Sequence, residues 1–179
     1  MFAMAVAACA PLQTRDPQAG AAHGDAAFDV TGRLSARHRS EAASAGFRWS
    51  HRHDGDELSL ASPLGQTLAE LRGDASSVRL TLPDGRTTQA ADWEALTANV
   101  LGAPLPVRGL AWWIRGVGHP GSPHTIERDA GGARAAVLRQ DGWEIVYEAR
   151  DDERPLRLRM TYPDTEIRLV IDSWSTSGR

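Results

Sequence analysis

The sequence of 179 residues contains no lysine and only one cysteine. All 20 basic residues are arginines, and with 23 acidic residues they leave a formal net charge of −3. A chain with this balance lacks the basic surface of a nucleic-acid-binding protein, so we expect no nucleic-acid partner. The single cysteine, Cys9, rules out an intramolecular disulfide framework and any zinc site made of several cysteines.

The sequence also lacks the short motifs that mark common active sites. It has no G-x-S-x-G elbow, no H-E-x-x-H helix and no glycine-rich phosphate loop. His51 and His53 could point two imidazoles from one strand face, but no third ligand is identifiable, so we interpret both as solvent-facing strand-end residues. His119 and His124 lie in a Gly/Pro-rich loop and are interpreted as surface residues. We therefore predict no enzyme, no metal site and no cofactor.

No stretch approaches the roughly 18 to 20 apolar residues of a membrane-spanning helix. The chain begins instead with eight apolar residues, and Val6-Ala7-Ala8-Cys9 resembles the lipobox of bacterial lipoproteins, whose cysteine is lipidated. We interpret residues 1–8 as a partial signal peptide, since no positive charge precedes Cys9. The alternative is a buried N-terminal segment with an incidental thiol. Residues 9–27 then read as a flexible tether, and residues 28–179 as one domain.

From Phe28 onward apolar residues recur at every second position, which predicts half-buried strands. The dipeptides Asp54-Gly55, Asp84-Gly85 and Asp141-Gly142 separate alternating runs and favour tight hairpins. Residues 90–116 differ, because their apolar residues have helical spacing. They predict one helix that Asp92 caps and a second over about 106–114. We therefore expect one curved antiparallel sheet with two helices on its concave side.

Six tryptophans lie in this predicted domain, three on strands and three in the helical segment. Large rings bury 150 to 250 Å² each, so they suit either an ordinary packed core or a lined cavity between sheet and helices. The sequence leaves these two alternatives open.

One turn carries an unusual residue at its tip. Pro63 and Gly65 mark a turn between two strands, and the residue between them is Leu64. Turn tips normally carry polar side chains because they face water. Leu64 therefore either folds back onto the core or meets something apolar outside the protein.

Five segments between Gly32 and Trp174 follow one another as GRLSAR, GFRWSHRHDGDELSLASPLGQTLAEL, LPVRGLAWWIRG, QDGWEIVYEA and IRLVIDSW. This ordered series resembles LolB, the family of outer-membrane receptors in the lipoprotein localisation pathway. The resemblance implies an incomplete antiparallel β-barrel with a helical lid over a hydrophobic cavity, as in the periplasmic carrier LolA. It implies a monomer, anchored by lipid to the outer membrane of a Gram-negative bacterium and facing the periplasm.

The resemblance also implies a function and its residues. The protein would accept lipoproteins from LolA by binding their acyl chains and insert them into the inner leaflet of the outer membrane. Cys9 would carry the lipid anchor, and Leu64, flanked by Pro63 and Gly65, would project toward the membrane. The cavity would be lined by Phe47, Trp49, Leu58, Leu60, Leu80, Leu110, Trp113, Ile145 and Tyr147.

Other classes of protein share parts of this pattern. A lipocalin-like envelope lipoprotein that binds a small hydrophobic ligand would share the sheet and the cavity but give Leu64 no role. A structural lipoprotein with a packed core would need neither. A soluble carrier similar to LolA would follow if Cys9 is never lipidated.

Overall fold

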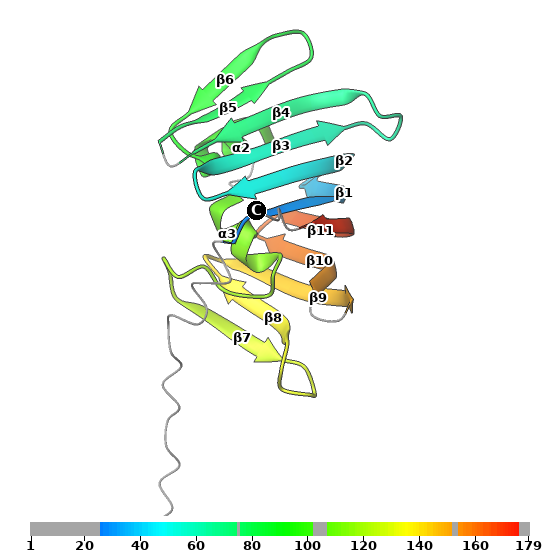
Figure 1. Ribbon diagram of the computed structural model, residues 1–179, viewed down its shortest axis with the longest axis vertical. Coiled ribbons are helices and arrows are strands. Elements are labelled where there is room, and N and C mark those ends of the chain that lie inside the picture. The colour runs from blue at the N-terminus through cyan, green and yellow to red at the C-terminus, as the bar shows by residue number, and fades with distance from the viewer. Residues whose placement is uncertain (1–25, 75, 102–106, 152–153, 176–179) are drawn as a thin grey trace, which may run out of the picture.

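The computed structural model describes residues 26–74, 76–101, 107–151 and 154–175, which form one antiparallel sheet with two helices (Figure 1). The strand order is β6-β5-β4-β3-β2-β1-β11-β10-β9-β8-β7, and β6 and β7 each have a neighbour on one side only. The sheet is therefore open, as expected for an incomplete barrel. Its strands are β1 (Phe28–His38), β2 (Glu41–Arg52), β3 (Gly55–Ala61), β4 (Thr67–Gly73), β5 (Val78–Thr81), β6 (Thr87–Ala90), β7 (His124–Arg128), β8 (Ala135–Gln140), β9 (Trp143–Asp151), β10 (Arg154–Tyr162) and β11 (Thr165–Ser175).

The sheet consists of two meanders that meet at its centre. Strands β1 to β6 run outward in one direction and β11 back to β7 in the other, so the first and last strands of the domain pair antiparallel. Their register places Leu34 opposite Leu169 and His38 opposite Thr165. A bulge lies between Thr31 and Gly32, and bulges increase the local bend of a strand. This bend contributes to the curvature of the sheet.

Tight turns join most neighbouring strands. Asp141 and Gly142 both have positive φ, 52° and 79°, as a two-residue type I′ hairpin requires. Aspartate tolerates this region better than most residues, and glycine adopts it without a steric cost. The three Asp-Gly dipeptides of the sequence all lie at hairpin turns, between β2 and β3, β5 and β6, and β8 and β9, so this prediction is confirmed.

The helices α2 (Trp93–Leu101) and α3 (Val107–Trp113) belong to the segment that leads from edge strand β6 to edge strand β7 (Figure 1). Asp92 caps α2, since its Oδ1 accepts a hydrogen bond of 2.7 Å from the backbone N–H of Ala95. Both helices pack on the apolar side of the sheet, because residues such as Leu96 and Ala111 share one hydrophobic cluster with strand residues. The predicted cap and the predicted position of the helices are confirmed.

One strand was not predicted. Strand β7 occupies part of the segment between the Gly/Pro loop and Trp143, and His124 begins this strand rather than lying in the loop. Strand β8 ends directly before the predicted hairpin at Asp141 and Gly142. Strand β7 has the burial pattern of a sheet edge, with Ile126 half-buried between exposed neighbours. Because an edge strand buries little apolar surface, its sequence alternation is weak.

Candidate functional site

The concave side of the sheet carries one hydrophobic cluster, and all nine predicted cavity residues either belong to it or pack against it. These side chains therefore share one interior. Trp113 and Ile145, 1% and 0% exposed, are enclosed between α3 and the strands. The buried members of the predicted set are Phe47, Trp49, Leu80, Trp113 and Ile145, and the half-buried members are Leu58, Leu60, Leu110 and Tyr147.

Polar side chains fasten α3 to the sheet. Gln140, which is 3% exposed, accepts hydrogen bonds at Oε1 from Trp113 Nε1 and from the backbone N–H of His119, both at 2.8 Å. Its Nε2 donates to the backbone carbonyls of His119 and Ser122. Tyr147 donates a hydrogen bond of 2.7 Å to the carbonyl of Trp113, and burial raises the pKa of the Tyr147 hydroxyl, so it remains a donor. The helix that covers the interior is thus held at its C-terminal end.

A cluster of aromatic rings lies at one end of the same face. Phe28 packs edge-on against Trp49 at 5.0 Å and against Trp174 at 5.7 Å, and stacks on His51 at 4.9 Å. The guanidinium of Arg115 lies 4.6 Å from the Phe28 ring centroid. Large rings from β1, β2 and β11 therefore close this end of the interior.

His51 is buried in this cluster, so the interpretation of it as a solvent-facing residue is wrong. It shares the Oδ1 atom of Asp56 with Trp49, since His51 Nδ1 and Trp49 Nε1 each lie 2.7 Å from that oxygen. Asp56 is itself buried and was not singled out from the sequence. The only feature of the sequence that indicated burial of Asp56 was its position directly after the Asp-Gly turn, on the face of β3 that carries Leu58. The other predicted surface residues differ among themselves, since His53 and His124 are exposed but His119 is half-buried.

The hairpin between β3 and β4 projects from the sheet and carries Leu64 at its tip (Figure 1). Leu64 is 90% exposed, so the core alternative for this residue is wrong. The Ser62 carbonyl accepts a hydrogen bond of 2.8 Å from the N–H of Gly65, and the Ser62 N–H donates to the carbonyl of Gln66. Gly65 has a φ of 82°, which completes a type I turn followed by a left-handed residue. Pro63 occupies the position at which proline favours this turn.

The neighbouring hairpin between β5 and β6 has the same turn with a different tip. Residues 82–86 repeat both backbone hydrogen bonds at 2.9 Å, and Gly85 has a φ of 84°. Asp84 stands where Leu64 stands in the first hairpin, and its side chain accepts a hydrogen bond from the N–H of Arg86. The turn geometry therefore does not require a leucine at the tip.

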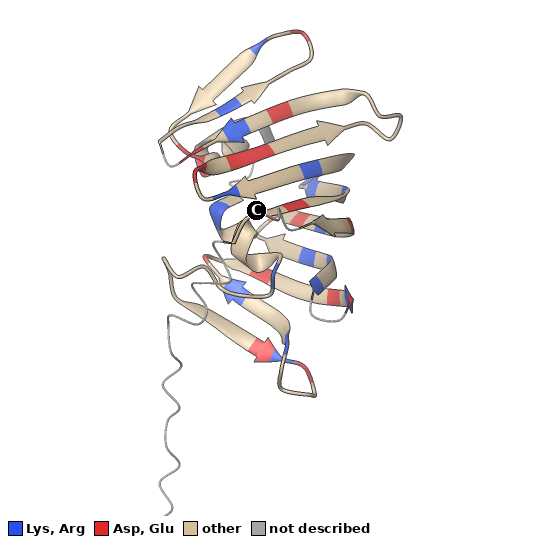
Figure 2. Cartoon of the chain, in the orientation of Figure 1, with Lys and Arg blue, Asp and Glu red and all other residues tan. Residues whose placement is uncertain are grey.

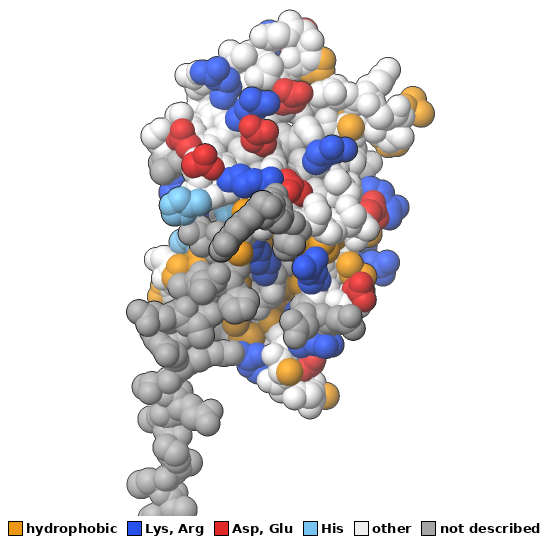
Figure 3. Space-filling model, viewed as in Figure 1, with side chains coloured by type: hydrophobic (Ala, Val, Ile, Leu, Met, Phe, Trp, Pro, Cys, Tyr) orange, Lys and Arg blue, Asp and Glu red, His pale blue; other side chains and the backbone are white. Residues whose placement is uncertain are grey.

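The β3–β4 hairpin is apolar over more than its tip. No charged residue occurs between Glu57 and Glu70, and Figure 2 shows the end of this hairpin without charged residues. Figure 3 shows hydrophobic side-chain atoms at the end of the projecting hairpin. In the described part of the chain, the exposed large hydrophobic side chains are Leu64 and Leu68, and both belong to this hairpin and its second strand.

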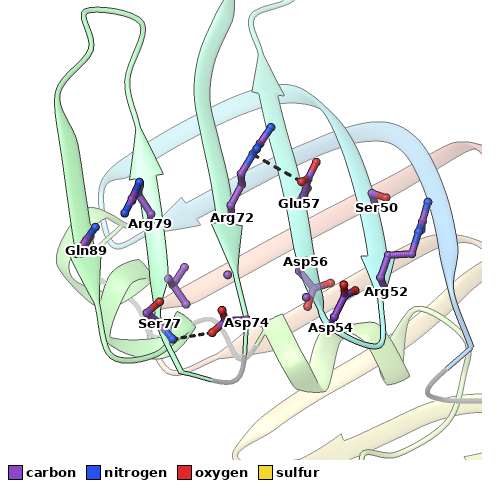
Figure 4. A pocket seen from close by; sticks show the side chains of 13 residues that line it. Ser50, Arg52, Asp54, Asp56, Glu57, Arg72, Asp74, Ser77, Arg79 and Gln89 are labelled. Carbon is purple, nitrogen blue, oxygen red and sulfur yellow. Dashed lines mark hydrogen bonds and ion pairs between the residues drawn. The ribbon is translucent and has the colours of Figure 1, made fainter.

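A polar pocket of about 550 Å³ lies over β2 to β6 (Figure 4). It holds arginines beside carboxylates, as in the pair of Arg72 Nε and Glu57 Oε1 at 3.8 Å. Asp74 accepts hydrogen bonds from Ser76 and Ser77, which keep the pKa of its carboxyl below the ordinary value. This mixture of charges does not suit an acyl chain. Among the described residues, no group of three or more His, Cys, Asp or Glu side chains could hold a metal ion.

The fold and the apolar interior define a class of protein. Two solved structures have this fold: a LolA superfamily protein from Nitrosomonas europaea, with a TM-score of 0.54 and 10% identity, and a putative outer membrane lipoprotein-sorting protein domain from Vibrio parahaemolyticus, with a TM-score of 0.54 and 12% identity. The first alignment covers 87% of this chain and 88% of the other, and the second 89% and 90%. The chain therefore has the open half-barrel fold of LolA-type proteins.

Sequence comparison identifies a family within this fold. The family model described as outer membrane lipoprotein LolB matches residues 26–174. Outer-membrane lipoprotein LolB of Chromobacterium violaceum is 39% identical over 153 residues, 84% of this chain and 81% of that protein. LolB of Nitrosomonas europaea is 38% identical over 153 residues, 82% of this chain and 72% of that protein.

The chain belongs to the LolB family. It is therefore an outer-membrane lipoprotein with a non-enzymatic role in lipoprotein localisation. The expected lipidation site, Cys9, and most of the expected tether lie outside the described residues. In the part of the chain that the structure describes, no helix is long and apolar enough to span a membrane.

Proposed function

We propose that this protein receives lipoproteins from the periplasmic carrier LolA, encloses their acyl chains under α3, and releases them into the inner leaflet of the outer membrane. The observation that carries this proposal is the pairing of a shared apolar interior with a separate apolar hairpin that faces solvent. The apolar interior can bind the acyl chains of a lipoprotein, and the apolar hairpin can contact the membrane that receives the lipoprotein.

The interior accounts for binding. Each CH2 group taken out of water contributes roughly 0.8 kcal/mol, so a long acyl chain exposed to water costs on the order of 10 kcal/mol. A receptor must supply most of this energy from apolar contacts. Because Trp93, Trp113 and Ile114 are each about 1% exposed, their rings and methyl groups fill the space beneath the helices. Acyl chains therefore enter when α3 moves away from the sheet, and the α3 residues return when the chains leave.

The hairpin accounts for delivery. Leu64 contributes about 1.5–3 kcal/mol when it is buried in lipid, which biases a contact with the bilayer without fixing it. Permanent attachment is the role of the lipid on Cys9, since several acyl chains are needed for stable anchoring. With the chain anchored at Cys9, Leu64 needs only to orient the domain. Transfer runs downhill in free energy, from a weaker-binding carrier to this receptor and then to the bilayer.

The test is a two-step transfer assay with a labelled lipoprotein loaded on LolA. The full chain is added first without membranes, and transfer of the label to it is measured. Liposomes are then added, and transfer of the label to them is measured. We expect both steps to occur. Absence of the first step with a folded protein and a cognate carrier would overturn the receptor function.

A lipocalin-like protein gives a different result in this assay. It would bind a free fatty acid but would not take a lipoprotein from the carrier. The anchor is tested separately with Cys9→Ala, which should abolish incorporation of a labelled fatty acid into the protein in cells. Unchanged labelling of this variant would exclude Cys9 as the lipidation site.

A further inference from the structure

His51 has a buried nitrogen with no partner. Its Nδ1 lies 2.7 Å from Asp56 Oδ1, but its Nε2 is buried and has no hydrogen bond to any residue that the structure describes. The residue is 9% exposed and lies against the ring of Phe28. Most buried side-chain nitrogens have a partner, so an orphan of this kind needs an explanation.

The contact with Asp56 determines which nitrogen of the His51 ring carries the proton. An ionised carboxylate only accepts hydrogen bonds, so His51 Nδ1 is the donor and holds the proton. In the neutral imidazole, Nε2 is then a bare acceptor. Asp56 Oδ1 also accepts from Trp49 Nε1, which fixes the carboxylate and therefore the direction of the imidazole. The lone pair of Nε2 is thus presented by a rigid, buried arrangement.

A purely structural role does not account for this choice of residue. An unpaired acceptor in a buried position destabilises the folded protein relative to one that has a partner. A phenylalanine could pack against Phe28 without this cost. A metal ion is a poor match, because no cluster of three His, Cys, Asp or Glu side chains occurs in the described ranges.

The position of His51 relates it to the cargo. Phe47, Trp49 and His51 alternate along β2 and lie on its buried face, and His51 is the second-last residue of the strand. Successive residues on one strand face are about 7 Å apart. An acyl chain that lies along Phe47 and Trp49 would therefore place its polar attachment near the strand end, where His51 lies.

An acylated polypeptide can supply the hydrogen-bond donor that His51 Nε2 lacks. Its acyl chains join a polypeptide whose backbone N–H groups are hydrogen-bond donors. An N–H that enters an apolar site without an acceptor carries the same penalty as an orphan acceptor. Pairing the two removes both penalties at once.

We propose that His51 Nε2 accepts a hydrogen bond from an amide N–H at the head of the bound acyl cargo. This inference rests on the proposed function, since it places the polar end of the cargo whose acyl chains occupy the interior. It makes His51 a specificity-determining residue that distinguishes acylated polypeptide from lipids whose linkages are esters alone.

Two probes that differ in one group test the inference. N-dodecanoylglycine methyl ester has an amide N–H, and its analogue with oxygen in place of N–H has none. Their affinities for the full chain are measured by calorimetry at pH 8. We expect the amide probe to bind about tenfold more tightly, the equivalent of one buried hydrogen bond.

Three variants and one spectroscopic measurement complete the test. His51→Phe should bind both probes equally and keep the wild-type affinity for the ester. His38→Phe, a half-buried histidine whose Nδ1 contacts Thr165 Oγ1 at 2.9 Å, is the matched control and should keep the tenfold preference. Trp49→Phe removes the second donor to Asp56 and should reduce the preference for the amide probe.

If His51→Phe does not fold, the 15N resonance of His51 Nε2 in the wild-type protein decides. It should move on addition of the amide probe and not on addition of the ester. Equal affinities of the wild-type protein for both probes would overturn the role of His51 and leave the receptor function intact. Failure of both probes to bind, together with failure of the transfer assay, would overturn the receptor function itself.

Discussion

Leu64→Asp should separate receipt of cargo from its delivery. Leu64 is 90% exposed, and the hydrogen bonds of its turn come from Ser62, Gly65 and Gln66 rather than from its side chain. The same turn elsewhere in the sheet already holds an aspartate, Asp84. The free energy of unfolding should therefore change by less than about 0.5 kcal/mol.

The effect on the membrane step should be much larger. A leucine buried in lipid contributes about 1.5–3 kcal/mol, and each 1.4 kcal/mol changes an equilibrium tenfold. Removing that contribution should weaken the encounter with a bilayer by about 10- to 150-fold. The aspartate adds the cost of bringing a charge toward the apolar layer, so the upper part of this range is expected.

The measurement uses both steps of the transfer assay. Leu64→Asp should take labelled lipoprotein from LolA at the wild-type rate but release it slowly into liposomes. Leu64→Met keeps an apolar side chain of similar size and should release at nearly the wild-type rate. If the aspartate variant has the wild-type unfolding free energy and also releases at the wild-type rate, Leu64 has no role in membrane contact.

Three further predictions concern the helices α2 and α3, the loop that follows α3, and the packing beneath the helices. Gly73→Ala should destabilise the protein by about 1–3 kcal/mol, seen as a lower urea midpoint, because the new Cβ would lie 2.8 Å from Val78 Cγ2 and 2.9 Å from Trp93 Cζ2. Gln140→Leu should cost about 3 kcal/mol, because it leaves Trp113 Nε1 without its acceptor, and should increase hydrogen exchange in α3. Burial lowers the pKa of His119, so the unfolded chain binds more protons than the folded chain near that pKa. The free energy of unfolding should therefore fall as the pH drops below about 6.5. In urea titrations at pH 7.5 and pH 5.5, His119→Asn should lose less stability between the two pH values than the wild-type protein does.

The fold could be largely predicted because its signals are local. Alternation of apolar residues along β2, β10 and β11 follows from the period of two residues in a strand that buries one face. The Asp-Gly dipeptides identify hairpins because they accept positive φ. Strand β7 was not predicted, because an edge strand buries little surface and its alternation of apolar and polar residues is therefore weak.

The candidate site could be predicted only in part. Apolar residues of strands and helices were expected to share an interior, and they do. The environment of His51 was not predictable, because it depends on Asp56 from the next strand and on Phe28 from the strand before. Gln140 is a similar case, since its partners lie in α3 and in the loop that follows it.

The sequence alone therefore determined the alternation of the strands, the turn at Pro63 and Gly65, the cap at Asp92 and, through resemblance, the family. These features depend on neighbouring residues, whose backbone preferences and side-chain spacing act over a few positions. Only the tertiary structure decided that Leu64 faces water and that His51 does not. Exposure and hydrogen bonding depend on which distant strands pack together, and that pairing is set by the fold as a whole.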